Sequence, residues 1–102
     1  MDERQRYWQR IRRYIREQFG MPGEVDDIVF LIGVREMGYG FQQLDQDTKT
    51  KVINFASIYL MNFMDSEARR KIQVEAEAQA KTEEEEIYKQ AIINYFREKQ
   101  II

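Results

Sequence analysis

The sequence predicts an all-α protein, a compact bundle of four to five helices in a single domain over residues 1–102. Helix-breaking residues are confined to one stretch, because the only proline is at position 22 and all five glycines lie between positions 20 and 40. The chain contains no β-hairpin signal and no strict alternation of apolar and polar residues. Hydrophobic residues make up 43% of the 102 residues, which suffices for one small core.

The first predicted helix covers residues 2–19 and is amphipathic. Its apolar side chains recur at helical spacing and trace one stripe along the helix. They are Tyr7, Trp8, Ile11, Tyr14, Ile15 and Phe19. Asp2 stands where the helix dipole favours negative charge, and Gly20 and Pro22 are expected to end the helix.

The second predicted helix covers residues 24–37, ends at Gly38 and is apolar on nearly every side. A helix with this pattern lies at the centre of a fold and has neighbours on several sides. Gly33 stands in its middle, where glycine costs about 1 kcal/mol relative to alanine. We therefore expect Gly33 to permit a close crossing with another helix.

A loop is predicted over residues 38–46, with Phe41 helping to anchor it to the core. Asp45 or Asp47 can cap the next helix by accepting hydrogen bonds from free backbone N–H groups. This third helix covers residues 47–64, and its broad apolar face predicts a second central helix.

A long charged helix is predicted from about residue 66, because the chain has neither glycine nor proline from 67 to 100. Its first half has only a thin apolar stripe, whereas its second half has a stronger apolar face that should pack on the core. Thr82 and Glu85 fit the capping-box pattern, so two helices that meet near residue 83 are the alternative.

Composition excludes several kinds of chemistry. Without cysteine there is no disulfide, thiolate metal site or thiol nucleophile, and without histidine the commonest general base and metal ligand are missing. Sixteen basic and 18 acidic residues give a net charge of −2, which offers no global attraction for nucleic acid or an anionic membrane. No apolar signal region follows the N-terminus, and the longest apolar run, 28–34, is too short to span a bilayer. We expect a cytoplasmic protein without a cofactor.

The segment Ile32-Gly33-Val34-Arg35-Glu36-Met37-Gly38 resembles the "IG-[VI]-[RQ]-E-[LM]-G" stretch of an uncharacterised family of small bacterial all-helical proteins. The helix start at 44–49, the apolar helix at 52–61 and the "IIxYF" segment at 92–96 are similar to that family as well. The resemblance covers residues 5–64 and 87–98, and the stretch 66–86 departs from the family pattern. Because the family has no assigned activity, the resemblance implies a compact helical domain and no particular function.

Two pairs of carboxylates have members three residues apart, Glu24 with Asp27 and Glu83 with Glu86. On a helix each pair faces one way, and such pairs hold Mg²⁺ and a nucleotide in all-α nucleotide pyrophosphohydrolases. Both pairs also lie at predicted helix starts, where the dipole favours each acidic residue by about 0.3–1 kcal/mol. We therefore expect no metal site and keep a Mg-dependent hydrolase as a lesser alternative.

The first helix is rich in arginine. Arg10, Arg13 and Arg16 recur every three residues and could form one open basic face that contacts phosphates, with Trp8 nearby to stack on bases. The six glutamates of residues 75–86 could instead neutralise this face. Nucleic-acid binding through the first helix is therefore the main alternative function.

Arg35 and Glu36 end the most apolar helix. An arginine there interacts well with the helix dipole, but it could also bind an anion or the carboxylate of a partner. Tyr39 and Phe41, with the glycines beside them, could form a binding loop. These four residues are the predicted ligand- or partner-binding residues, and no catalytic residue is predicted.

The pattern as a whole predicts a non-catalytic intracellular module for protein interaction, regulation or oligomerisation. Residues 66–86 can bury little apolar surface against their own core. This region is therefore the predicted surface for a homodimer or for another protein partner.

Overall fold

The computed structural model describes residues 2–39, 44–74 and 81–102, and these ranges contain helices and no strand. The helices of the described residues are α1 (Glu3–Phe19), α2 (Val25–Met37), α3 (Gln46–Leu60), the 3₁₀ helix η1 (Met61–Phe63), α4 (Ser66–Val74) and α5 (Lys81–Glu98). The predicted fold class, an all-α bundle of four to five helices, is confirmed. None of the helices described is both long and apolar enough to cross a membrane.

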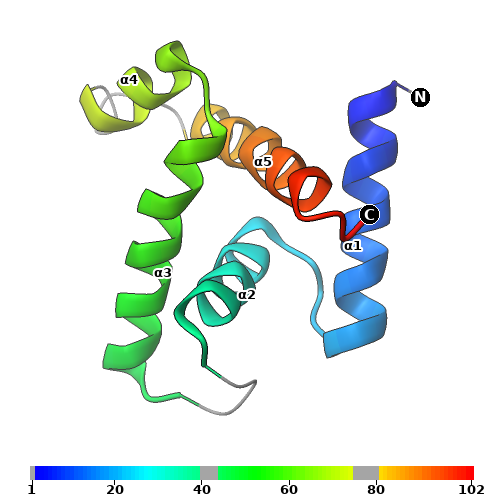
Figure 1. Ribbon diagram of the computed structural model, residues 1–102, viewed down its shortest axis with the longest axis vertical. Helices are drawn as coiled ribbons and strands as arrows, with labels where there is room; N and C mark the ends of the chain where they lie inside the picture. Colours follow the sequence, from blue (N-terminus) through cyan, green and yellow to red (C-terminus); the bar gives the residue numbers. More distant parts are fainter. Residues whose placement is uncertain (1, 40–43, 75–80) are drawn as a thin grey trace.

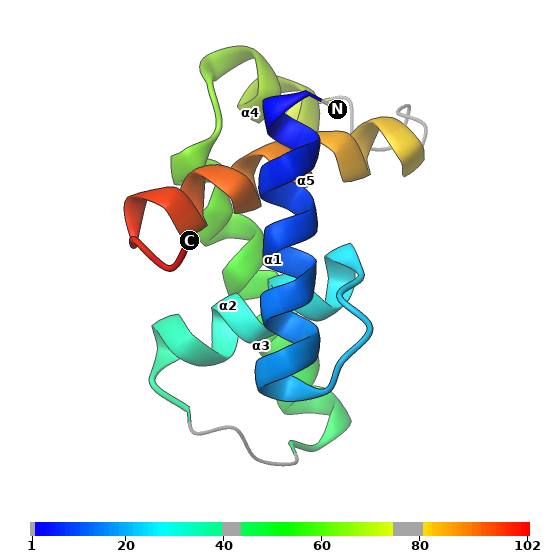
Figure 2. The same cartoon turned by 90° about the vertical axis from the view of Figure 1, so that its right-hand side faces the viewer.

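The helices enclose a core between two outer helices. In Figure 1, α1 and α3 stand on opposite sides of the molecule, and α2 and α5 lie between them. Figure 2 shows α5 crossing behind α1, with α2 nearer the other end of α1. The most completely buried core side chains are Ile11, Ile15, Ile28, Val52, Leu60, Ile92, Ile93 and Tyr95.

Local capping signals define where several helices begin and end. Asp2, Asp45 and Asp65 each accept a hydrogen bond, at 2.7–2.8 Å, from the backbone N–H three residues later. Gly20 and Gly38 follow α1 and α2 in the left-handed conformation, with φ of 67° and 79°. These ends agree with the predicted boundaries because each depends on residues that are close in the sequence.

The helix predicted over 24–37 is central, as expected, because α2 has buried residues on most of its sides. The helix predicted over 47–64 is not surrounded by other helices, because only one of its sides faces the core. Its buried residues Val52, Ala56 and Leu60 face the core, whereas Ile58 on the opposite side is 68% exposed. The second central position belongs instead to α5, which packs against α1, α2 and α3.

The long charged helix predicted from about residue 66 is contradicted, because the structure has two helices, α4 and α5, in this region. Ala68 of α4 lines the same hollow as Ile87 and Ala91 of α5. In one continuous helix, residues about 20 positions apart would be separated by about 30 Å. α4 and α5 are therefore not parts of one straight helix, and the alternative boundary near residue 83 lies close to the observed start at Lys81.

Candidate functional site

Five polar side chains gather where the C-terminal end of α2 meets α3 and α5. We call them the Tyr95 cluster: Arg35, Glu36, Tyr59, Tyr95 and Lys99. The hydroxyl of Tyr95 donates a hydrogen bond to Oε2 of Glu36 and accepts one from Nη1 of Arg35, both at 3.0 Å. Nζ of Lys99 lies 3.9 Å from Oε1 of Glu36. One phenol thus connects a guanidinium and a carboxylate that are neighbours in the sequence.

Aromatic packing fixes the position of the Tyr95 hydroxyl. The side chain is only 1% exposed, and its ring makes edge contacts with Tyr59 and Phe63 at centroid distances of 6.2 and 5.5 Å. The charged groups of Arg35 and Lys99 lie 5.9 and 6.0 Å from the same ring centroid, within the range of cation–π attraction. The ring is therefore part of the core, whereas its hydroxyl meets charged side chains.

The cluster favours a charged Glu36 and a neutral Tyr95. Burial raises the pKa of Glu36, but hydrogen bonds from Tyr59 and Tyr95 and the positive charges of Lys99 and Arg35 lower it by more, so that the pKa falls below its ordinary value of 4.5. Burial, together with the hydrogen bond to Glu36, raises the pKa of Tyr95 to about 12. The neutral phenol keeps the proton that it donates to the carboxylate.

The structure brings together two of the four residues predicted to bind a ligand or partner. Arg35 and Glu36 both belong to the Tyr95 cluster, whereas the exposed Tyr39 lies beyond the end of α2 and outside the cluster. Phe41 lies outside the described residues. Sequence reasoning missed Tyr95, because it falls on the buried stripe of its helix and therefore looks like a core residue.

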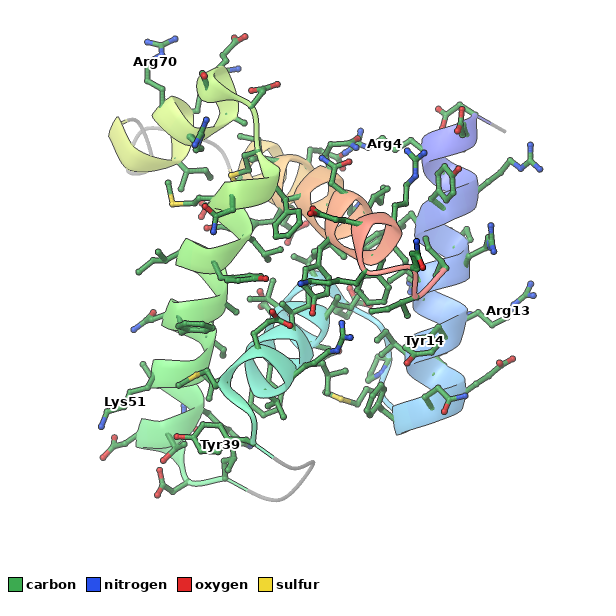
Figure 3. The ribbon with its side chains drawn as sticks, viewed as in Figure 1. Arg4, Arg13, Tyr14, Tyr39, Lys51 and Arg70 are labelled. Carbon is green, nitrogen blue, oxygen red and sulfur yellow. The ribbon has the colours of Figure 1, made fainter. Side chains whose placement is uncertain are left out.

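A hollow of about 150 Å³ adjoins the Tyr95 cluster between α1, α2 and α5. Its walls include the apolar side chains of Phe19, Leu31 and Phe96, and Arg35 is the one charged residue among the described residues that line it. Figure 3 shows Tyr14 extending from α1 toward the middle of the molecule, where it forms another part of the lining.

The predicted basic face of α1 is open in the described part of the chain. Arg10, Arg13 and Arg16 are all exposed, and none of their side chains forms an ion pair or a hydrogen bond with another described residue. Figure 3 shows Arg13 pointing away from the other helices. Glu86, one of the glutamates expected to neutralise this face, pairs instead with Arg4 at 2.8 Å.

The first carboxylate pair stabilises the start of α2. Oδ2 of Asp27 accepts a hydrogen bond from the backbone N–H of Glu24 at 3.3 Å, as in a capping box. Oε1 of Glu24 lies 3.8 Å from Nη2 of Arg12. Both carboxylates therefore have structural partners within the fold.

Glu86, from the second carboxylate pair, has basic partners of its own. Oε2 of Glu86 lies 2.8 Å from Nη2 of Arg4, and its Oε1 lies 3.3 Å from Nζ of Lys89. The side chain of Glu83 lies outside the described part. Within residues 2–39, 44–74 and 81–102, no three acidic, cysteine or histidine side chains are grouped so that they could hold a metal ion. The described residues thus give the Mg-dependent alternative no support.

The side of α3 that faces away from the core forms a second candidate surface. We call it the outer face of α3: Lys51, Asn54, Phe55, Ile58 and Asn62. Lys51 and Ile58 share this face because they are seven residues apart, and Figure 3 shows Lys51 pointing away from the molecule. Ile58 is 68% exposed and Phe55 is 38% exposed. Sequence reasoning counted Phe55 and Ile58 in the broad apolar face of the helix predicted over 47–64, because a wide apolar face does not show which part of it is covered.

Comparisons with known proteins give no relative from which a function can be taken. No protein-family model matches the chain, and no significant match occurs among curated proteins or solved structures. The resemblance to small bacterial helical proteins therefore stays a prediction.

Proposed function

We propose that this protein is a non-catalytic interaction module that associates with a second copy of itself through the outer face of α3. The observation that carries the proposal is the 68% exposure of Ile58 in the middle of a charge-free segment. Apolar surface removed from water contributes about 25 cal/mol per Å², a gain that Ile58 does not obtain within one copy.

The charge pattern favours a second copy as the partner. Charged residues make up 33% of the chain, yet residues 52–64 contain none. In a two-fold symmetric interface, each side chain near the axis lies close to its own copy, so a charged residue there would meet a like charge. Residues 52–64 of this surface carry no charge, so they avoid that repulsion near the axis and offer little to a partner that is recognised by its charge.

The spacing of side chains also suits an antiparallel pair of α3 helices. With a two-fold axis at Ile58, a residue n positions before it lies level with the residue n positions after it in the other copy. Asn54 then lies level with Asn62, and Phe55 lies level with Met61. Amide therefore meets amide and apolar side chain meets apolar side chain, as an isologous contact requires.

The proposed surface replaces residues 66–86 as the site of association. Ala68 and Ile72 of α4 pack against the core, so these two apolar side chains of the region already have contacts inside the molecule. Residues 75–80 lie outside the description.

Replacing Ile58 by glutamate is expected to abolish association, because it places two carboxylates near the axis. The wild type should change from monomer to dimer as its concentration rises in sedimentation velocity, whereas the variant should stay monomeric. Because the side chain is exposed, monomer stability should change by only about 0.5 kcal/mol. Gln18→Glu adds the same charge at an exposed position of α1 and should leave dimerisation intact. A wild type that is monomeric at every concentration, or an Ile58→Glu variant that dimerises normally, contradicts the proposal.

Helix orientation can be tested separately, because the chain has no cysteine of its own. Asn54→Cys and Asn62→Cys should form disulfide dimers faster when the two variants are mixed than when either is oxidised alone. This follows because the antiparallel pair brings position 54 of one copy level with position 62 of the other. Faster cross-linking of each variant with itself would contradict the antiparallel arrangement.

The open basic face of α1 supports nucleic-acid binding as a second candidate function. Each lysine or arginine that contacts a phosphate adds about one unit to the slope of log affinity against log salt concentration. Replacing Arg10, Arg13 and Arg16 together by glutamine should therefore reduce that slope by about three units and weaken binding to a labelled duplex in fluorescence anisotropy. Lys49→Gln, at an exposed position of α3, should have no such effect. No measurable binding by the wild type, or an unchanged slope in the triple variant, would rule this function out.

A further inference from the structure

The hollow between α1, α2 and α5 combines apolar walls with a single cationic side chain. We propose that it binds a small organic acid, whose apolar body fills the hollow and whose carboxylate is held by Arg35. This inference does not depend on self-association, because none of the residues of the outer face of α3 lines the hollow.

The walls are suited to a flat or branched apolar group. The ring of Tyr14 makes edge contacts with Phe19 and Phe96, in both cases at a centroid distance of 6.2 Å, with interplanar angles of 72° and 82°. Leu31 and Ile101 supply aliphatic surface beside these rings. Apolar walls with a few polar groups at one place are the usual composition of a small-molecule site.

The size of the hollow limits the ligand. Its volume of about 150 Å³ equals the share of roughly five water molecules in liquid water, at about 30 Å³ each. The apolar body should therefore have about five or six non-hydrogen atoms, which corresponds to a phenyl ring or a short branched alkyl chain. A long fatty acyl chain would exceed this volume.

Arg35 provides the site for the acid group. Its side chain forms no ion pair with a carboxylate among the described residues, and the one hydrogen bond of that side chain, from Nη1, goes to the hydroxyl of Tyr95. A guanidinium carries five N–H donors in a planar fork, so most of them remain for a carboxylate. Glu36 does not occupy these donors, because its carboxylate accepts a hydrogen bond from Tyr95 and lies near Lys99 instead. Arg35, Lys99 and Glu36 together carry a net charge of +1, which one bound carboxylate would balance.

Phenylacetate is a suitable probe because it joins a phenyl ring to a carboxylate. In a titration followed by amide chemical shifts, it should cause saturable shifts at Leu31, Phe96 and Ile101. Phenylacetamide has the same ring without the charge and should bind about tenfold more weakly, because hydrogen bonds between charged groups are the stronger ones. Acetate carries the charge without the ring and should bind more weakly than phenylacetate as well.

Two variants connect this preference to Arg35. Arg35→Gln should remove the preference for phenylacetate over phenylacetamide while leaving the ring-induced shifts in place. Arg13→Gln removes the same charge from an exposed position on the far side of α1 and should preserve the preference. The inference is overturned if phenylacetate causes no saturable shifts, if the amide binds equally well, or if both variants reduce the preference to the same extent. Arg35→Lys keeps the charge but loses the fork, so a preference equal to that of the wild type would exclude bidentate binding.

Discussion

Replacing Gly33 by alanine is expected to lower the free energy of unfolding by about 1–3 kcal/mol, the usual cost of overpacking a core. A Cβ at this position would lie 2.6 Å from Cγ1 of Val52, 2.7 Å from the carbonyl oxygen of Val52 and 3.1 Å from Cβ of Ala56. The valine side chain can rotate, but the carbonyl oxygen belongs to the backbone of α3. The added methyl group must therefore push α2 and α3 apart along a major contact of the fold.

Helix propensity alone would predict the opposite change in the free energy of unfolding for Gly33→Ala. Alanine is favoured over glycine inside a helix by about 1 kcal/mol, so an unhindered site would be stabilised by the same substitution. Urea unfolding of the wild type and of Gly33→Ala distinguishes the two outcomes directly. A more stable variant would show that α2 and α3 are not in close contact at this point.

A double-mutant cycle can assign the effect to the contact with Val52. Val52→Ala alone should destabilise the protein because it opens a cavity in the core. In the Gly33→Ala background the same change should cost less, because it removes the clash with Cγ1. It should not restore full stability, since the carbonyl oxygen of Val52 remains in place. Additive effects of the two substitutions would contradict this account.

The crossing at Gly33 could be anticipated because its signal is local. A glycine in the middle of an otherwise apolar helix has a cost in helix propensity, and a close helix contact is the usual reason for it. Helix starts at aspartates and helix ends at Gly20 and Gly38 were predictable for the same reason. In each case the decisive residues lie within a few positions of one another.

The packing of α4 as a helix separate from α5 was not predictable in the same way. Residues 67–100 contain no glycine or proline, so a local reading favours one continuous helix. The packing of Ala68 and Ile72 against the core decides otherwise. Similarly, helical periodicity shows that Ile58 belongs to an apolar set, but it cannot show that α5 and α2 cover only the opposite side of α3.

The Tyr95 cluster joins residues about 60 positions apart, so only the tertiary structure could bring it to light. Its central residue has a sequence signal that is easily passed over. Phenylalanine would fill the same space on this buried stripe, so the hydroxyl of a tyrosine there is not needed for packing. A buried hydroxyl usually has a hydrogen-bond partner. That signal indicates that a partner exists, but it does not identify Glu36 or Arg35.

Replacing Tyr95 by phenylalanine is expected to lower the free energy of unfolding by about 1–3 kcal/mol, because it leaves a charged partner without its hydrogen bond. The ring and its edge contacts are kept, so the loss reports on the hydroxyl. Arg35 is exposed and can turn to water, whereas the side chain of Glu36 is only 18% exposed. Most of the cost should therefore arise at the carboxylate.

The stability lost in Tyr95→Phe should depend on pH, and the pKa of Glu36 determines whether the loss grows or shrinks in acid. This pKa is lower in the folded protein than its ordinary value of 4.5. A carboxylate of this kind stabilises the fold fully above its ordinary pKa, and the stabilisation disappears as the pH falls through the lower, folded value. The difference in stability between the wild type and Tyr95→Phe should therefore be largest near neutral pH and shrink in acid.

Urea unfolding at neutral and acidic pH tests this dependence, with two comparison variants. Tyr39→Phe removes a hydroxyl from an exposed side chain and should change stability by no more than about 0.5 kcal/mol at either pH. Glu36→Gln removes the titrating group, so adding Tyr95→Phe to it should cost an amount that does not vary with pH. If the single variant Tyr95→Phe lost the same free energy at both pH values, the hydroxyl would act through packing or through Arg35, and Glu36 would not be its main partner.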